Sequence, residues 1–358
     1  MKKSYLLLLS AALFGWASCN RTADTPTPTT PSVETLEVPQ PSYFPTMVYD
    51  LKSNPLTTDG FQLGRSLFYD GILSRNGTIA CGTCHQQAAA FTHHGHDLSH
   101  GIDDKIGMRN APAIQNMAWE KDFLWDGGVH QLDLFPMAPL ENPVEMDEKL
   151  SNVLQKLRDS KNPNYPELFK KAFGTTEINT ERFTKALSQF MLFLVSNNSR
   201  YDLFLKGTTN AITATEKEGL ALFKQKCGSC HAGELFSDRS FRNNGLDMTR
   251  STDQGRFRVT QNPLDQNKFK VPSLRNVGYT SPYMHDGRFS TLEQVLDHYA
   301  KNVKQSPTLD PILQQNTSLG IPLTDDEKLK IIAFLKTLSD ESFVKDWRFS
   351  DPGFGKAF

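Results

Sequence analysis

The sequence predicts a mostly α-helical protein in which one structural unit occurs twice and long loops connect the helices. Three observations support this prediction. Apolar residues recur at helical spacing, residue pairs typical of helix starts occur along the chain, and a composite motif is repeated. The motif joins Gly-x-x-Leu-Phe to Cys-x-x-Cys-His, over 64–85 and again over 219–231. Cys81 and Cys227 lie 146 residues apart, an interval the size of a domain, so the sequence indicates a duplication.

The N-terminus is typical of an export signal. Two lysines precede an apolar stretch over 5–14, and small residues then lead to Cys19. This order is similar to a bacterial lipoprotein signal, so we expect residues 1–18 to be a signal peptide and Cys19 to be lipidated at a membrane. Trp16 departs from the usual aliphatic residue of such signals. Ordinary cleavage that leaves a free Cys19 stays the alternative.

Residues 19–42 are expected to form a tether between the membrane and the folded part. The stretch 22–32 is rich in Thr and Pro and nearly free of apolar residues, so it should be extended. The chain has 358 residues, and we expect an N-terminal domain over 43–205 and a C-terminal domain over 206–358. The formal net charge is −1 and the basic residues are scattered, so no nucleic acid partner is expected.

Local patterns predict four helices. The first is expected over 183–194, where apolar side chains share one helical face: Phe183, Leu187, Phe190, Met191 and Leu194. The other three are expected to begin at capping boxes: Thr215 with Glu218, Ser290 with Glu293 and Thr324 with Glu327. The last two helices are predicted to bury Leu292, Val295, Leu296 and Tyr299, and Leu329, Ile332, Leu335 and Leu338. Long loops are expected over 95–117 and 232–290.

Cys-x-x-Cys-His is the attachment signature of c-type haem. Each motif supplies two thiols for the porphyrin vinyl groups and one histidine for the iron: Cys81, Cys84 and His85, then Cys227, Cys230 and His231. A zinc ribbon needs its two cysteine pairs roughly 15–20 residues apart. A thioredoxin-like site needs a βαβ setting, and disulfides leave the histidines unexplained. We therefore expect two covalently bound haem c groups.

From about residue 60 to residue 338 the chain resembles the bacterial dihaem cytochrome c peroxidases and the related MauG enzymes. Besides both haem motifs, the matching stretches in the family's order are Gly64-x-x-Leu-Phe68, Leu73-Ser74, Gly107-Met-Arg-Asn-Ala-Pro112, Phe123-Leu-Trp-Asp-Gly127, Asn142-Pro-Val-Glu-Met146, Val271-Pro-Ser-Leu-Arg-Asn276 and Pro282-Tyr-Met-His-Asp-Gly287. The resemblance implies two cytochrome c-like haem domains. The N-terminal haem would react with peroxide, and the C-terminal haem would store electrons.

The resemblance also implies roles for single residues. It makes His85 the proximal ligand of the reactive haem, and it makes Glu145 the distal carboxylate that moves protons during peroxide cleavage. Outside the matched motif, Glu145 would be read as a solvated charge at a helix entry. Trp125 matches the tryptophan that lies between the haems and relays electrons, although core packing explains an aromatic residue equally well.

A calcium site and a capping histidine follow from the same resemblance. Asn110, Thr280 and Pro282 match the family's calcium site, whose carbonyl oxygens suit a hard cation. His100 matches the loop histidine that caps the reactive iron in typical peroxidases, although the spacing here is about two residues longer. The other histidines of this loop are expected to be solvated surface residues: His93, His94 and His96.

Two positions depart from the family pattern. The usual sixth ligand of the C-terminal haem is a methionine, but the matching position is Tyr299, as in the MauG branch. A phenolate ligand would lower the haem potential. Met284 and Met248 stay open as substitutes. Phe135 stands where the family often has a glutamine, so the distal pocket should be drier.

The family resemblance implies a peroxidase, and the export signal with Cys19 predicts that it is anchored as a lipoprotein on the periplasmic side. It would reduce hydrogen peroxide with electrons from a small exported donor, either a cytochrome c or a cupredoxin. Two alternatives stay open. One is a MauG-like enzyme that oxidises a partner protein, which Tyr299 favours, and the other is a dihaem electron-transfer protein without catalysis. A homodimer and a monomer also both stay open.

Overall fold

The structure, a computed structural model, describes residues 34–314 and 318–353. The predicted signal peptide, Cys19 and the first part of the predicted tether therefore lie outside the described residues. From Glu34 onward the chain forms one compact unit. No helix in the described ranges is long and apolar enough to cross a membrane.

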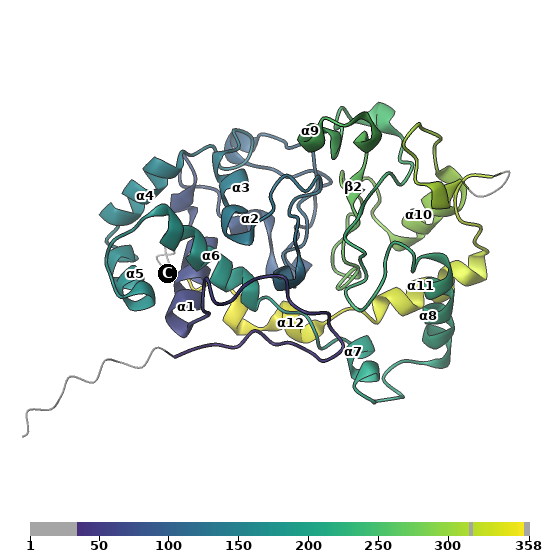
Figure 1. Cartoon of the computed structure of the whole chain (residues 1–358), viewed down its shortest axis with the longest axis horizontal. Helices are drawn as coiled ribbons and strands as arrows, with labels where there is room; N and C mark the ends of the chain where they lie inside the picture. The colour runs from purple at the N-terminus through teal and green to yellow at the C-terminus, as the bar shows by residue number, and fades with distance from the viewer. Residues whose placement is uncertain (1–33, 315–317, 354–358) are drawn as a thin grey trace, which may run out of the picture. The chain divides into compact units, whose positions relative to one another are not determined.

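Helices carry most of the regular structure, and the strands are very short (Figure 1). The helices are α1 (Thr58–Tyr69), α2 (Cys81–Cys84), α3 (Met137–Glu141), α4 (Leu150–Asp159), α5 (Tyr165–Phe173), α6 (Thr180–Phe193), α7 (Arg200–Leu205), α8 (Ala214–Lys226), α9 (Phe257–Thr260), α10 (Leu292–Asp297), α11 (Asp325–Lys336) and α12 (Glu341–Lys345). Strands β1 (Phe241–Arg242) and β2 (Phe269–Lys270) pair antiparallel. The predicted mostly α fold is confirmed, and so are the long loops over 95–117 and 232–290, which carry only short elements.

Helix α1 leads towards the first cysteine motif and packs along α6. It begins after Thr57, whose side-chain oxygen accepts a hydrogen bond from the amide of Gly60. Gly64 lies where the two helices meet, and a Cβ atom there would collide with the carbonyl oxygen of Ala186. The glycine of the first Gly-x-x-Leu-Phe motif therefore permits close helix packing. The predicted apolar residues of α6 are buried, as expected.

The same arrangement recurs in the second half. Helix α8 leads towards the second cysteine motif and packs along α11. A Cβ atom on Gly219 would collide with the carbonyl oxygen of Lys330. Both copies of the motif thus place a glycine at an equivalent helix contact, which supports the predicted duplication.

Two of the three predicted capping boxes are wrong by one or two residues. The observed boxes are Thr213 with Glu216 at α8, Thr291 with Gln294 at α10 and, as predicted, Thr324 with Glu327 at α11. At α8 the earlier start is favoured because Glu216 also forms an ion pair with Arg200 at 2.6 Å. At α10 the Oε1 atom of Gln294 accepts hydrogen bonds from the amides of both Ser290 and Thr291.

The predicted faces of the last two helices also differ in part. Leu329 is 65% exposed, so its predicted place in the core is wrong. The other predicted apolar residues of that helix are buried: Ile332, Leu335 and Leu338. Tyr299 lies beyond the end of α10, in a π-helical turn over His298–Asn302. Its side chain nevertheless lines one cavity together with Leu292, Val295 and Leu296, so the predicted shared face is confirmed.

Buried apolar side chains form two main clusters. The larger joins α1 with α4–α6, and the second joins α7, α8, α10 and α11. Beyond α11 the chain returns to the larger cluster, where Phe343 and Phe349 are buried. Residues 34–42, at the end of the predicted tether, also lie against it: Val38 is buried there, and the amide of Leu36 donates to the carbonyl oxygen of Leu56 at 3.0 Å. The domain boundary near residue 205 stays a prediction.

Candidate functional site

The first Cys-x-x-Cys-His motif forms the short helix α2 and the residue that follows it. His85 Nδ1 lies 2.8 Å from the carbonyl oxygen of Phe91. Because a carbonyl oxygen can only accept, Nδ1 carries the proton and Nε2 keeps a free lone pair. Burial lowers the pKa of His85 to about 4, so the ring is neutral at neutral pH. A neutral imidazole with a free Nε2 is the form that binds a metal ion.

The second motif repeats this geometry. His231 Nδ1 lies 3.0 Å from the carbonyl oxygen of Phe236, which again leaves Nε2 with a free lone pair. Burial lowers the pKa of His231 as well. Both imidazoles are therefore held in one tautomer by a backbone carbonyl five or six residues further along the chain. The same hydrogen bond from Nδ1 to a backbone carbonyl occurs in both motifs, which indicates a metal-ligand role for each histidine.

The four thiols of the motifs form no disulfide. Burial raises the pKa of Cys81 and of Cys227 to about 12, and that of Cys84 to about 11. A redox-active or zinc-binding cysteine needs a lowered pKa, so these thiols do not resemble a thioredoxin site. In the part of the chain that the structure describes, no three His, Cys, Asp or Glu side chains are placed to hold a metal ion. Thioether attachment of haem is the interpretation that fits them.

A carboxyl group lies beside the first motif. Asn142 Nδ2 donates to Glu145 Oε1 at 2.8 Å. Burial raises the pKa of Glu145, although the hydrogen bond from Asn142 opposes this. The backbone of Glu145 contacts Gly101 so closely that a Cβ atom on Gly101 would collide with it. The residue before Gly101 is His100, whose carbonyl oxygen lies 3.5 Å from Cys84 Sγ. The structure therefore brings Glu145 and the backbone of His100 together next to the first motif.

A cavity of about 280 Å³ lies beside the second motif. Its wall includes the second cysteine pair, His231, Tyr299 and Met284, whereas Met248 is not among the described lining residues. Burial raises the pKa of Tyr299 to about 12, so the phenol is protonated unless a ligand displaces the proton. Asn244 Nδ2 lies 3.4 Å from the sulfur of Met284. Both candidate sixth ligands therefore reach the same cavity as His231.

Trp125 lies on another wall of this cavity. Its indole Nε1 donates to the carbonyl oxygen of Asn110 at 2.9 Å, and its own carbonyl oxygen accepts from the amide of Lys270 at 2.8 Å. The three calcium candidates line the cavity as well: Asn110, Thr280 and Pro282. Since a carbonyl oxygen has two lone pairs, the bond from Trp125 leaves Asn110 one further acceptor position. Phe135 is 6% exposed, and its ring centroid lies 5.6 Å from that of Phe123.

The histidines of the loop after the first motif are not all on the surface. His93 is 3% exposed, so its predicted surface position is wrong, and neither ring nitrogen has a hydrogen-bond partner. The ring of His96 stacks on that of His100 at a centroid distance of 4.1 Å and lies 5.8 Å from that of His93. His93 ends the buried stretch that begins at Ala89, whereas His94 and His96 lie beyond it in exposed positions.

Comparison with known proteins identifies the family. The sequence model of "Di-haem cytochrome c peroxidase" matches residues 58–210. The chain is 35% identical over 299 residues to the "Methylamine utilization protein MauG" of Methylorubrum extorquens, with 81% of each chain covered. It is 36% identical over 293 residues to the "Cytochrome c551 peroxidase" of Nitrosomonas europaea, with 80% of this chain and 82% of that relative covered. The chain belongs to the di-haem cytochrome c peroxidase and MauG family.

Solved structures agree with this membership. A MauG-like protein associated with microbial copper homeostasis has a TM-score of 0.80 and is 33% identical, with 88% of this chain and 99% of that chain covered. The diheme peroxidase BthA of Burkholderia thailandensis shares the fold, with a TM-score of 0.69 at 21% identity over 80% of this chain and 87% of that one. Membership of the di-haem family implies two haem c groups. It does not separate peroxidases from MauG-like enzymes, since relatives of both names match at similar identity.

One residue of this di-haem family member was missed by sequence reasoning. His285 is 3% exposed and its Nε2 has no hydrogen-bond partner. Its ring stacks on Phe269 at 3.6 Å between centroids and meets Trp125 edge-on at 6.5 Å. A signal was available, because Phe-Leu-Trp-Asp-Gly and Tyr-Met-His-Asp-Gly are two copies of one motif in which Trp125 and His285 occupy the same position.

Proposed function

We propose that this protein is a dihaem c-type peroxidase that reduces hydrogen peroxide to water with electrons from a small cytochrome c or cupredoxin. The observation that carries the proposal is the half-buried carboxyl of Glu145 beside the first haem motif, with its raised pKa. A carboxyl group whose pKa is raised by its surroundings is suited to take up a proton and return it. A protein that only carries electrons has no need of such a group.

In this proposal, each motif holds one haem. Cys81 and Cys84 would hold the first haem by thioether bonds, and His85 would bind its iron through Nε2. Cys227, Cys230 and His231 would take these roles in the second motif. The carbonyl oxygens that fix the tautomers of the two histidines support this assignment, because they leave Nε2 free on each ring. When bound, haem supplies the site at which the O–O bond of peroxide is cleaved and the electrons for its reduction.

The chain's own contribution is proton transfer and positioning. Glu145 accepts a proton from the inner oxygen of peroxide and returns it to the outer oxygen, which leaves as water. Two electrons and two protons in total convert one peroxide to two waters. Asn142 Nδ2 holds the carboxyl by its hydrogen bond at 2.8 Å. The apolar ring of Phe135 lines the cavity that also contains the second motif, and it limits water there.

Further residues complete the proposal. Trp125 lies between the two halves and relays electrons between the haems. Tyr299 would hold the second haem together with His231, supported by its place in the same cavity wall. Asn110, Thr280 and Pro282, which line one cavity, would hold a calcium ion. His100 would act as the residue that covers the first haem. The loop carrying it already lies against Cys84, 3.5 Å from its sulfur.

We also propose that the protein works on the periplasmic side as a lipoprotein attached through Cys19. The sequence of the export signal supports this location. Incorporation of labelled palmitate into the full chain, and its loss in Cys19→Ala, is the expected result. A wild-type chain that carries no label contradicts the anchor. Size-exclusion chromatography with light scattering decides between a monomer and a homodimer.

The second candidate is a MauG-like enzyme that oxidises a residue of a partner protein. The presence of Tyr299 in the cavity favours it, together with the 33% identity to a MauG-like protein of known structure. It predicts peroxide-dependent modification of one specific protein and weak turnover with soluble cytochromes. The third candidate, a dihaem electron-transfer protein, predicts two permanently low-spin irons and no reaction with peroxide.

The test uses purified protein that contains both haems. Wild type should turn over peroxide with a reduced donor, and Glu145→Gln should slow this by about 10²-fold or more, the usual contribution of a general acid–base group. Glu141→Gln, an exposed carboxylate on the preceding helix, is the matched control and should leave the rate unchanged. Haem content is measured for every variant. Equal rates for wild type and Glu145→Gln would remove Glu145 from the reaction and the main support for the proposal.

A further inference from the structure

The loop that orients His231 is attached to the segment 271–275 by side chains. Ser237 Oγ donates to the carbonyl oxygen of Val271 at 2.6 Å, and Ser273 Oγ donates to that of Leu235 at 2.7 Å. Arg275 Nε donates to the carbonyl oxygen of Glu234 at 2.8 Å. The last two bonds hold the carbonyl groups immediately before Phe236, whose own carbonyl oxygen accepts from His231 Nδ1.

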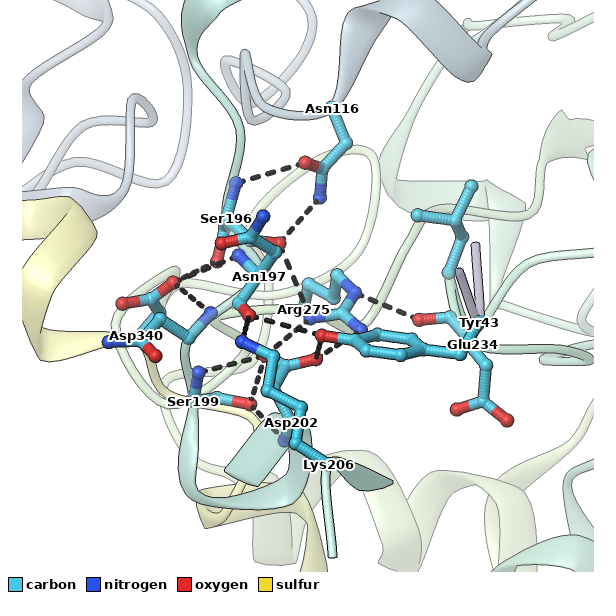
Figure 2. A network of polar contacts seen from close by, with 12 residues as sticks. Tyr43, Asn116, Ser196, Asn197, Ser199, Asp202, Lys206, Glu234, Arg275 and Asp340 are labelled. Carbon is cyan, nitrogen blue, oxygen red and sulfur yellow. Dashed lines mark hydrogen bonds and ion pairs between the residues drawn. The ribbon is translucent and has the colours of Figure 1, made fainter. Parts of the chain in front are cut away.

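The guanidinium group of Arg275 is also held by the carboxylate of Asp202 (Figure 2). Its Nη1 and Nη2 atoms donate to the two carboxylate oxygens of Asp202 at 3.0 and 2.9 Å, and both side chains are 0% exposed. The guanidinium also lies over the ring of Phe44, 4.5 Å from its centroid. A fully desolvated, bidentate pair of this kind leaves the arginine little freedom, so the Nε atom is a rigid donor.

These bonds from Ser273 and Arg275 form a side-chain brace for the His231 loop, and the first motif has no side-chain equivalent of it. There the carbonyl oxygen of Phe91 accepts from the backbone amide of Ile114 at 3.2 Å. Residues 110–116 (Asn-Ala-Pro-Ala-Ile-Gln-Asn) repeat the pattern of 270–276 (Lys-Val-Pro-Ser-Leu-Arg-Asn), so Gln115 occupies the place of Arg275. Gln115 Nε2 donates to the carbonyl oxygen of Arg275 at 2.7 Å. Among the described residues, no side chain of 110–116 donates to a carbonyl group of residues 86–91, the segment that carries the Phe91 carbonyl. The duplication has therefore diverged at this position, and the charged brace belongs to the second site alone.

We propose that Arg275 and Ser273 are positioning residues that set the reduction potential of the second haem through His231. This inference rests on the proposed function, because it assumes that His231 ligates that haem. By fixing the Glu234 and Leu235 carbonyl groups, the two side chains aim the Phe236 carbonyl at His231 Nδ1. Phe236 has a φ of 54° and Phe91 a φ of 63°, left-handed conformations that are uncommon for phenylalanine and need support from their surroundings. The backbone amide of Ile114 contributes this support at Phe91, and the side chains of Ser273 and Arg275 contribute it at Phe236.

The direction of the effect follows from the chemistry of the imidazole. A hydrogen bond from Nδ1–H to a carbonyl makes the ring a stronger donor to the metal and fixes its orientation. A stronger donor stabilises the ferric state more than the ferrous state, which lowers the potential. Removing the brace lets Phe236 relax and weakens this bond. The potential of the second haem should then rise, while the first haem, whose loop lacks the brace, should not respond.

The experiment measures both haem potentials by optical titration and the resting electron paramagnetic resonance spectrum in holoprotein. Two variants are compared with wild type. Ser273→Ala removes one hydroxyl bond, and Arg275→Lys keeps the charge but cannot bridge Asp202 and Glu234 together. Each should shift the potential of the second haem upward and broaden its low-spin signal, with the first haem unchanged. Ser342→Ala is the matched control, because Ser342 Oγ donates to Asp340 in the same polar region but not to the His231 loop.

The outcomes separate the inference from the proposed function. A wild-type protein that lacks the second haem overturns both together. A wild type with two haems, combined with unchanged second-haem potentials in both variants, overturns the inference alone. An equal shift at both haems, or the same shift in Ser342→Ala, also overturns it, because the residues would then act only through general stability. If Arg275→Lys does not fold, the result with Ser273→Ala decides.

Discussion

The carboxylate of Asp202 offers a sharp test of how the two halves are held together. It accepts five hydrogen bonds, from both terminal nitrogens of Arg275, from the amide and hydroxyl of Ser199 and from the hydroxyl of Tyr43, at 2.7–3.0 Å (Figure 2). Asp202→Asn places an NH₂ group among these donors and leaves the buried Arg275 without a counter-charge. Removing one partner of a buried ion pair costs about 3–5 kcal/mol, so the free energy of unfolding should fall by that amount.

The pH dependence of this loss gives a second check. Burial alone would raise the pKa of Asp202, but the hydrogen bonds from Arg275 outweigh burial and hold the pKa below that of a free carboxyl. A carboxyl whose pKa is depressed on folding stabilises the native state above its unfolded pKa of about 3.9, and the contribution is lost as the pH falls through the folded pKa. The difference between wild type and Asp202→Asn should therefore be complete at neutral pH and should shrink only in acid.

Urea unfolding followed by circular dichroism measures this difference. Asp325→Asn is the control, because that carboxylate pairs with Lys328 but has a side chain that is 91% exposed, and exposed pairs contribute little. A loss below about 1 kcal/mol at neutral pH, the value of a surface pair, would refute the claim that the buried charge of Arg275 depends on Asp202.

Three further predictions concern packing and the cavity. Gly64→Ala and Gly219→Ala should each lower the free energy of unfolding by about 1–3 kcal/mol in urea, because the added methyl group collides with backbone rather than with a movable side chain. Unchanged stability in either variant contradicts the close helix contact. Tyr299→Phe should alter the resting electron paramagnetic resonance signal of the second haem, and an unaltered signal points to Met284. Phe135→Gln buries an amide in an apolar wall, and an unpaired buried amide costs about 1–3 kcal/mol. We expect a lower melting temperature in calorimetry, and an unchanged one shows that the amide finds a partner or water.

Local sequence patterns were sufficient for some elements and misleading for others. The apolar spacing of α6 predicted a buried helix because its residues contact the core at every turn. At α8 the pattern contains threonines at 213 and 215, each with a glutamate three residues later. Which threonine caps the helix depends on Arg200, which lies outside the helix and binds Glu216. A local reading could not include that contact.

In the candidate site, too, some features could be predicted from local sequence and others could not. Both haem motifs could be read from the sequence, because attachment chemistry requires adjacent cysteines and histidine. The burial of His93 was missed, although the residue directly follows the buried stretch from Ala89 to Thr92. The role of Arg275 emerges only when 110–116 and 270–276 are aligned as copies and their different contacts are compared.

The return of α12 to the larger apolar cluster makes the N-terminal half depend on the end of the chain. Arg65 Nε donates to the carbonyl oxygen of Ser350 at 2.6 Å, and Gln87, two residues past the first haem histidine, donates to that of Asp346 at 2.7 Å. Phe343 and Phe349 fill the cluster beside them. A fragment that stops at residue 205 would leave this apolar surface open to water. The apolar core of the N-terminal half is therefore complete only when residues 343–350 have joined it.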